Sequence, residues 1–329
     1  MRVLRFLGYG VLTIVVLLAV TIVALWFYSP FAPAVVMSDP LPTGRRITDD
    51  GLLANYFPGA GPGKHAGILL LGGSEGGLGA GVTHMAKDLQ AHGYSVLQVS
   101  YFRGPGQSDR LELVPLELFD RAIVWLKSQA EVDGERLAVV GGSKGAEAAL
   151  IVAARHPELR AAVAGMPSNV AWQGLDWNIL KQIAMPPNGS WSLDGKPIPY
   201  VHYVKAFKKT LVEFYTASLL RFPPDSDAVI HIELSHASVL LVCGKQDTLW
   251  PSCLMADRVK ARATEKGGPA VTVLAYDNAG HGVFGIPADK SNPNYTQLHT
   301  LGGTDDGINA ARADSWPKAL AHLEGALKP

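Results

Sequence analysis

The pattern of apolar and polar positions divides the chain into three parts. An uncharged, strongly apolar run extends from Phe6 to about Tyr28. Residues 29–48 contain four prolines and little periodicity, which is typical of a linker. From residue 49 to residue 329, short apolar runs alternate with segments of helical spacing. We therefore expect an N-terminal membrane segment at 1–28, a linker at 29–48 and one folded domain at 49–329.

The first apolar run has the length of a transmembrane helix. It exceeds roughly 20 residues, enough to cross a bilayer core, and is longer than the 7–15 apolar residues of a signal peptide. Three aromatic residues at 26–28 fit an interfacial belt. Arg2 and Arg5 precede the run and the next basic residue is Arg45, so the positive-inside rule places the domain outside the cytoplasm. A single-pass anchor is the favoured interpretation, and a cleaved signal peptide is the alternative.

Strands and helices alternate through most of the domain. The expected strands are Leu52–Phe57, Gly67–Leu71, Ser95–Tyr101, Arg136–Val140, Ala161–Ala164, Val239–Cys243 and Val271–Tyr276. The expected helices are Ala80–His92, Pro115–Ala130, Lys144–Arg155 and about Ile308–Leu327. A Gly/Pro-rich turn separates the first two strands, which indicates a hairpin. The alternation predicts an α/β fold with a mostly parallel sheet and helices on both faces.

One stretch interrupts this alternation. Residues 167–232 separate two expected strands by far more than an ordinary connection, and they are rich in aromatic residues. We expect a lid inserted over the carboxyl edge of the sheet. Its aromatic side chains either contact a bound molecule or pack a small core of the lid itself.

Composition removes several classes of function. The formal net charge is zero, so no general attraction to nucleic acid is implied. Cys243 and Cys253 are the two cysteines, and two in a chain of this length are not a disulfide framework. No Cys/His cluster suggests zinc. We expect both cysteines to be packing residues, and we expect no metal and no cofactor.

The strongest local motif is the G-x-S-x-G sequence at Gly141–Gly145. It follows an apolar strand and precedes a helix, which is the context of a nucleophile elbow. Glycines flank Ser143 because side chains there would clash in so tight a turn. The helix that follows points its N-terminus at the serine and favours a developing oxyanion.

Two later residues complete a candidate catalytic triad in the order typical of this motif. Asp247 lies in the turn after the strand Val239–Cys243, where a triad acid is expected. His281 lies between two glycines shortly after the strand Val271–Tyr276 and is the candidate base. Asp277 is a competing acid, although it lies close to the histidine in sequence.

An oxyanion requires backbone donors in addition to the triad. The N–H of Lys144, which follows the nucleophile, is one candidate. The glycine-rich loop 72–77 is expected to supply the other, with the N–H of Ser74 as first choice and that of Glu75 as second. A phosphate-binding loop is the rival interpretation, but no Lys-Ser/Thr follows the glycines.

Several segments together resemble one family. The chain is similar to the C-terminal catalytic domain of acyl-CoA thioesterases and bile acid-CoA:amino acid N-acyltransferases, a branch of the α/β hydrolases near the dienelactone hydrolases. The segments are 71–77 (LGGSEGG), 101–104 (YFRG), 114–119 (VPLELF), 142–147 (GSKGAE), 172–174 (WQG), 190–197 (SWSLDGKP), 247–252 (DTLWPS), 280–281 (GH) and 302–304 (GGT). The resemblance implies that Ser143 is the nucleophile, Asp247 the acid and His281 the base.

The resemblance also implies an activity. It suggests a hydrolase of acyl-CoA thioesters or carboxylic esters, with an acyltransferase as the alternative. The amino-acid-conjugating members use a cysteine nucleophile, so the serine here favours transfer to water. Candidate substrate contacts are Glu75, Trp172, Trp191 and Trp250. Acyl-CoA is cytosolic whereas the anchor predicts an external domain, and the sequence leaves this conflict open.

Overall fold

A central eight-stranded sheet organises the chain in the computed structural model, which describes residues 2–30, 32–49, 51–204, 209–292 and 295–328. The strands are β1 (Arg45–Ile47), β2 (Leu53–Phe57), β3 (His65–Leu71), β4 (Ser95–Ser100), β6 (Val132–Gly142), β7 (Leu159–Gly165), β10 (Ser238–Gly244) and β11 (Val271–Tyr276). Their order is β1-β2-β4-β3-β6-β7-β10-β11. From β4 to β11 neighbouring strands are parallel, as predicted, and β1 and β2 add an antiparallel edge.

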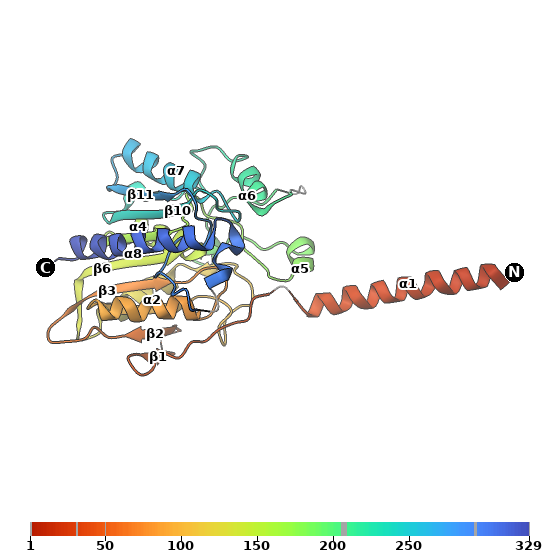
Figure 1. Cartoon of the computed structure of the whole chain (residues 1–329), viewed down its shortest axis with the longest axis horizontal. Coiled ribbons are helices and arrows are strands. Elements are labelled where there is room, and N and C mark those ends of the chain that lie inside the picture. Colours follow the sequence, from red (N-terminus) through yellow and green to blue (C-terminus); the bar gives the residue numbers. More distant parts are fainter. Residues whose placement is uncertain (1, 31, 50, 205–208, 293–294, 329) are drawn as a thin grey trace.

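Helices cover both faces of this sheet (Figure 1). One face packs against α3 (Glu117–Lys127), α4 (Lys144–Arg155) and α7 (Ser252–Glu265). The other packs against α2 (Ala80–Ala91) and α8 (Asp305–Ala326). Because both faces are covered, the central strands are apolar on both sides, which explains their continuous runs of Val, Leu, Ile and Ala.

The predicted hairpin between the first two strands is wrong. β2 pairs with β4, and β4 separates it from β3. The run Ile68–Leu71 is buried on both faces, so β3 takes a central position between two parallel neighbours. A Gly/Pro-rich connection permits a hairpin, but burial of a doubly apolar strand decides the pairing.

The stretch 167–232 forms a layer beside the carboxyl edge of the sheet. It contains α5 (Ile179–Ala184), β8 (Trp191–Leu193), β9 (Lys196–Pro197) and α6 (Leu211–Leu219), and the short helix η1 (Ile232–Leu234) follows. β8 and β9 form a small sheet with β5 (Val114–Pro115). Trp172, Val201 and Leu219 form a separate buried cluster with Trp250 and Met255.

The N-terminal helix α1 (Arg2–Phe27) projects away from this body (Figure 1). Its segment Tyr9–Phe27 is long and apolar enough to cross a membrane, a property that signal sequences share. The predicted linker is partly ordered, because β1 lies within it. Its backbone also bonds to the domain, from Leu78 N to Val36 O at 2.8 Å and from Ser38 N to Leu78 O at 3.0 Å.

Candidate active site

The G-x-S-x-G motif forms a strained turn between β6 and α4. Ser143 adopts a left-handed backbone conformation with φ = 56°, which is costly for a residue other than glycine. A Cβ on Gly141 would lie 2.1 Å from the carbonyl oxygen of Gly145. A Cβ on Gly145 would lie 2.3 Å from the carbonyl oxygen of Gly72. Glycine is therefore required on both sides of the serine, for the steric reason expected from the sequence.

The structure brings the three predicted triad residues together. The Nε2 atom of His281 lies 2.9 Å from Ser143 Oγ, and its Nδ1 atom lies 2.9 Å from Asp247 Oδ2. The side chains of His281 and Asp247 are 8% and 2% exposed. An ionised carboxylate only accepts hydrogen bonds, so Nδ1 carries the hydrogen and Nε2 is free to accept that of the serine hydroxyl.

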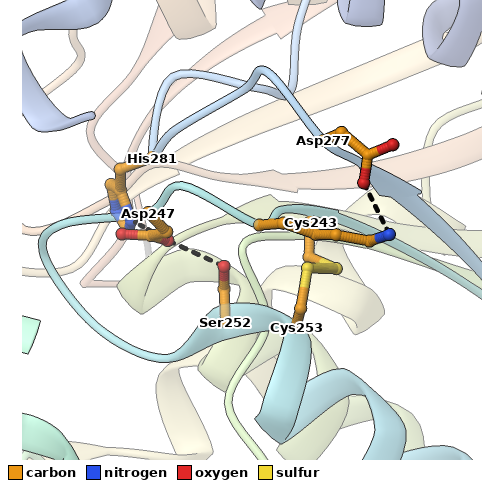
Figure 2. The surroundings of a disulfide bond; sticks show 7 residues. Cys243, Asp247, Ser252, Cys253, Asp277 and His281 are labelled. Atoms are coloured by element: carbon orange, nitrogen blue, oxygen red, sulfur yellow. Dashed lines mark hydrogen bonds and ion pairs between the residues drawn. A yellow bond between two sulfur atoms is a disulfide. The ribbon is translucent and has the colours of Figure 1, made fainter. Parts of the chain in front are cut away.

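Asp247 is held by its own loop. Its Oδ1 accepts the backbone N–H groups of Leu249 (2.9 Å) and Trp250 (3.2 Å), and its Oδ2 accepts the Ser252 hydroxyl (2.7 Å). The competing acid Asp277 is 79% exposed and forms an ion pair with Lys245 instead (Figure 2). The geometry therefore favours Asp247 as the partner of the imidazole.

A disulfide closes this loop, which corrects the expectation of two packing cysteines. Cys243 at the end of β10 is bonded to Cys253 in the first turn of α7. The ring spans the segment that carries Asp247 and Ser252 (Figure 2). A spacing of ten residues shows no disulfide by itself; the strand–loop–helix geometry brings the two sulfur atoms together.

The glycine-rich loop 72–77 packs against the elbow. A Cβ on Gly73 would lie only 3.4 Å from that of Ser143. Ser74 and Lys144 line the same cavity as Ser143. The Trp177 indole N–H bonds the carbonyl of Ser74 at 2.9 Å, which fixes the loop. The oxyanion-donor roles of the Ser74 and Lys144 N–H groups stay predictions.

Glu75 of this loop is half-buried and lines the same cavity as Ser143. Its Oε1 accepts the N–H of Gly73 at 3.1 Å. Burial raises the pKa of Glu75, against the opposing effect of backbone hydrogen bonds and of His281. Its predicted contact with a substrate stays a prediction.

A buried ion pair behind the serine was not predicted from the sequence. Lys144 Nζ lies 2.9 Å from Glu147 Oε2 and 2.9 Å from Ser190 Oγ. Glu147 Oε1 accepts the backbone N–H of Trp172 (2.9 Å) and the indole N–H of Trp191 (2.7 Å). Burial lowers the pKa of Lys144, opposed by the charge of Glu147. The pair therefore joins the elbow helix to the inserted segment.

Two of the predicted substrate contacts need correction. Trp172 and Trp191 are fully buried, and neither lines the cavity. Trp172 packs in the separate cluster with Val201 and Leu219, as the alternative interpretation proposed, whereas Trp191 packs in the main core on one face of the sheet. Trp250 does line the cavity, and its ring packs edge-on against His281 with 5.7 Å between centroids.

The cavity beside Ser143 has a volume of about 810 Å³ and mostly apolar walls. Its polar lining residues include Ser74, Glu75, His84, Ser143, Lys144 and His281. The remaining walls come from several elements: Pro33, Ala34, Val36, Met85, Met166, Leu175, Trp177, Leu211, Tyr215, Trp250 and Phe284. This volume lies in the range of small-molecule sites.

Fold and site geometry define an α/β hydrolase. Among solved structures, a putative dienelactone hydrolase from Klebsiella pneumoniae is similar, with a TM-score of 0.53 at 15% identity, covering 85% of this chain and 96% of that one. A puromycin-hydrolyzing peptidase of Mycobacterium tuberculosis gives a TM-score of 0.56 at 18% identity, covering 87% of this chain and 39% of that one. These likenesses concern the fold.

The family follows from the sequence comparison. The model described as BAAT / Acyl-CoA thioester hydrolase C terminal matches residues 114–329, and the chain belongs to this family. Mouse (Mus musculus) acyl-coenzyme A thioesterase 5 is 25% identical, over 86% of this chain and 66% of its own length. Mouse acyl-coenzyme A amino acid N-acyltransferase 1 is 28% identical, over 68% of this chain and 49% of its own length. The chain spans about half to two thirds of the length of such relatives.

Proposed function

We propose that this protein is a serine hydrolase that cleaves acyl thioesters or carboxylic esters. The observation that carries the proposal is the hydrogen-bonded chain from Ser143 through His281 to Asp247, beside a cavity with mostly apolar walls. Membership of a family whose named relatives include acyl-coenzyme A thioesterases agrees with this activity.

The mechanism follows from the positions of these groups. His281 Nε2 takes the proton of Ser143 as Oγ bonds to the acyl carbon, and the carbonyl oxygen becomes an oxyanion held by the N–H groups of Ser74 and Lys144. Collapse of this intermediate breaks the C–S or C–O bond, and the imidazolium protonates the leaving group. Water, deprotonated by His281, then attacks the acyl-enzyme and releases the acid and free Ser143.

Transfer to an amine is the second candidate, because some relatives carry the name acyl-coenzyme A amino acid N-acyltransferase. The serine nucleophile favours water over an amine acceptor. Product analysis with and without glycine or taurine separates the two reactions. If the conjugated product forms faster than the free acid, the main reaction is transfer to the amine and not hydrolysis.

We further propose a single-pass anchor at residues 1–28 and an external catalytic domain at 49–329 with its insertion at 167–232. The apolar length of α1 and the basic residues before it support this orientation. The Cys243–Cys253 disulfide supports it independently, because disulfides persist in oxidising compartments. An external domain favours an ester or thioester other than cytosolic acyl-CoA.

A fluorophosphonate probe and a substrate screen test the activity. Wild-type protein should be labelled and should hydrolyse simple esters or acyl-CoAs, and Ser143→Ala should abolish labelling and lower hydrolysis at least about 10³-fold. Ser128→Ala, at an exposed serine of the α3 terminus, is the matched control and should behave as wild type. Labelling that persists in Ser143→Ala would refute the assignment.

A further inference from the structure

Side-chain hydrogen bonds attach the end of α1 to the inserted segment, including one from the Ser29 hydroxyl, just after the helix, to the carbonyl oxygen of Trp177. Asn178 Nδ2 donates to the carbonyl oxygens of Leu25 (2.8 Å) and Trp26 (3.1 Å). Asn178 Oδ1 accepts the N–H groups of Leu180 and Lys181, both at 3.1 Å. One buried amide therefore bonds the last turn of α1 and the first turn of α5, whose backbone groups would otherwise lack partners.

This attachment sets the depth of α5 relative to a membrane. The uncharged part of α1, Phe6–Phe27, exceeds roughly 20 residues, which at ~1.5 Å per residue span a little more than about 30 Å. That length matches a hydrocarbon core of roughly 30 Å. If α1 spans the bilayer, its last turn lies at the membrane surface. Asn178 then holds α5 at the same level.

The side chains of α5 suit that position. Ile179 and Ile183, four residues apart, lie on the same side of the helix and are 57% and 73% exposed. Met185, just after the helix, is 55% exposed. On α6, which lies at the same end of the molecule as α1 and α5 (Figure 1), Leu211 is 52% exposed. Water is a poor environment for such a group of apolar side chains, and a bilayer surface is a good one.

Segments near α1 and α5 also line the cavity. Ala34 and Val36, in the linker after α1, are exposed and are cavity residues. Trp177 lines it immediately before Asn178, and Leu211 lines it at the start of α6. The cavity wall therefore includes residues near the proposed membrane surface, and Ser143 lines the same cavity.

We propose that the substrate is an acyl ester or thioester that resides in the bilayer, and that its acyl chain enters the cavity from the membrane surface between the linker, α5 and α6. This inference rests on the proposed hydrolase activity and anchor. It names the substrate class as a lipid. Ser143 would break the acyl C–O or C–S bond of a lipid whose other part remains in the membrane, and water would release the fatty acid.

The test uses the full chain reconstituted in phosphatidylcholine vesicles. Two substrates are compared: a phospholipid with a fluorogenic acyl ester in the vesicle, and water-soluble p-nitrophenyl butyrate. The variant Ile179→Asp/Ile183→Asp places charge at the proposed membrane contact without touching a cavity residue. Val124→Asp, at a 68% exposed position of α3, is the matched control for adding charge at an exposed apolar site.

We expect the Ile179→Asp/Ile183→Asp variant to lose at least tenfold in hydrolysis of the vesicle lipid and to stay within twofold of wild type on the soluble ester. Val124→Asp should retain both activities. Equal lipid hydrolysis by the two variants, or an equal loss on both substrates, would overturn the inference. Wild-type protein that cleaves the soluble ester through Ser143 but not the vesicle lipid would also overturn it, with the hydrolase intact. If neither substrate is cleaved in a Ser143-dependent way, the proposed function itself is refuted.

Discussion

The predicted catalytic triad and the other walls of the cavity are built in different ways. Each reactive group follows a strand of the central sheet: Ser143 after β6, Asp247 after β10 and His281 after β11. Elsewhere, the cavity walls include residues of the linker, Trp177 before α5, and Leu211 and Tyr215 of α6. A rigid sheet can hold atoms at hydrogen-bond distance, whereas appended segments can vary without disturbing that geometry. The comparison suggests that the sheet provides the chemistry and the appended segments select the substrate.

The substitution with the largest expected effect changes only the predicted catalytic triad. Asp247→Asn replaces the acceptor of His281 Nδ1–H with an amide that can favour the wrong tautomer. We expect kcat to fall about 10⁴-fold, equal to about 5 kcal/mol of barrier, with little change in KM. Steady-state kinetics on the best ester of the screen measures this. Asp277→Asn, at the exposed competing acid, should leave kcat unchanged; the opposite ranking of the two variants would assign the acid to Asp277.

The second-largest expected effect concerns the buried ion pair of Lys144 and Glu147, which joins α4 to the inserted segment. Glu147→Gln leaves the buried Lys144 ammonium without its counter-charge, and we expect the free energy of unfolding to fall by about 3–5 kcal/mol. Lys144→Met in the same chain should restore part of this loss, because no unpaired buried charge remains. Urea unfolding followed by circular dichroism measures both variants.

The exposed pair of Lys245 and Asp277 is the control for this prediction. Lys245→Met should cost less than about 1 kcal/mol, since exposed ion pairs contribute little. A loss of similar size at the buried and exposed pairs would contradict the connecting role assigned to Lys144 and Glu147.

The smallest expected effect concerns the disulfide that closes the loop carrying Asp247. Removal of the Cys243–Cys253 disulfide releases a short loop, and we expect a loss of about 2–3 kcal/mol in unfolding free energy. Wild-type protein with dithiothreitol and the Cys243→Ala/Cys253→Ala variant should show similar losses, and the variant should not respond to the reductant. Two free thiols in the unreduced, urea-unfolded wild type would contradict the bond.

Local signals account for much of the agreement between prediction and structure. The helix 144–155 and the strand 271–276 have the predicted bounds, because each is a continuous run ended by clear turn residues. The predicted triad residues meet because an elbow, a strand-end acid and a late histidine are all local patterns at strand ends. Pairing of β2 could not be predicted this way, because it depends on which apolar strand is buried on both faces.

The sequence by itself determined the alternating elements, the apolar N-terminal run and the identity of the groups available for chemistry, since each depends on neighbours within a few residues. Only the tertiary structure decided which distant groups share an environment. It joined Cys243 to Cys253, placed Trp172 and Trp191 around Glu147, and set Asn178 against the end of α1. Such contacts depend on how whole elements pack in three dimensions, and spacing along a chain does not specify that packing.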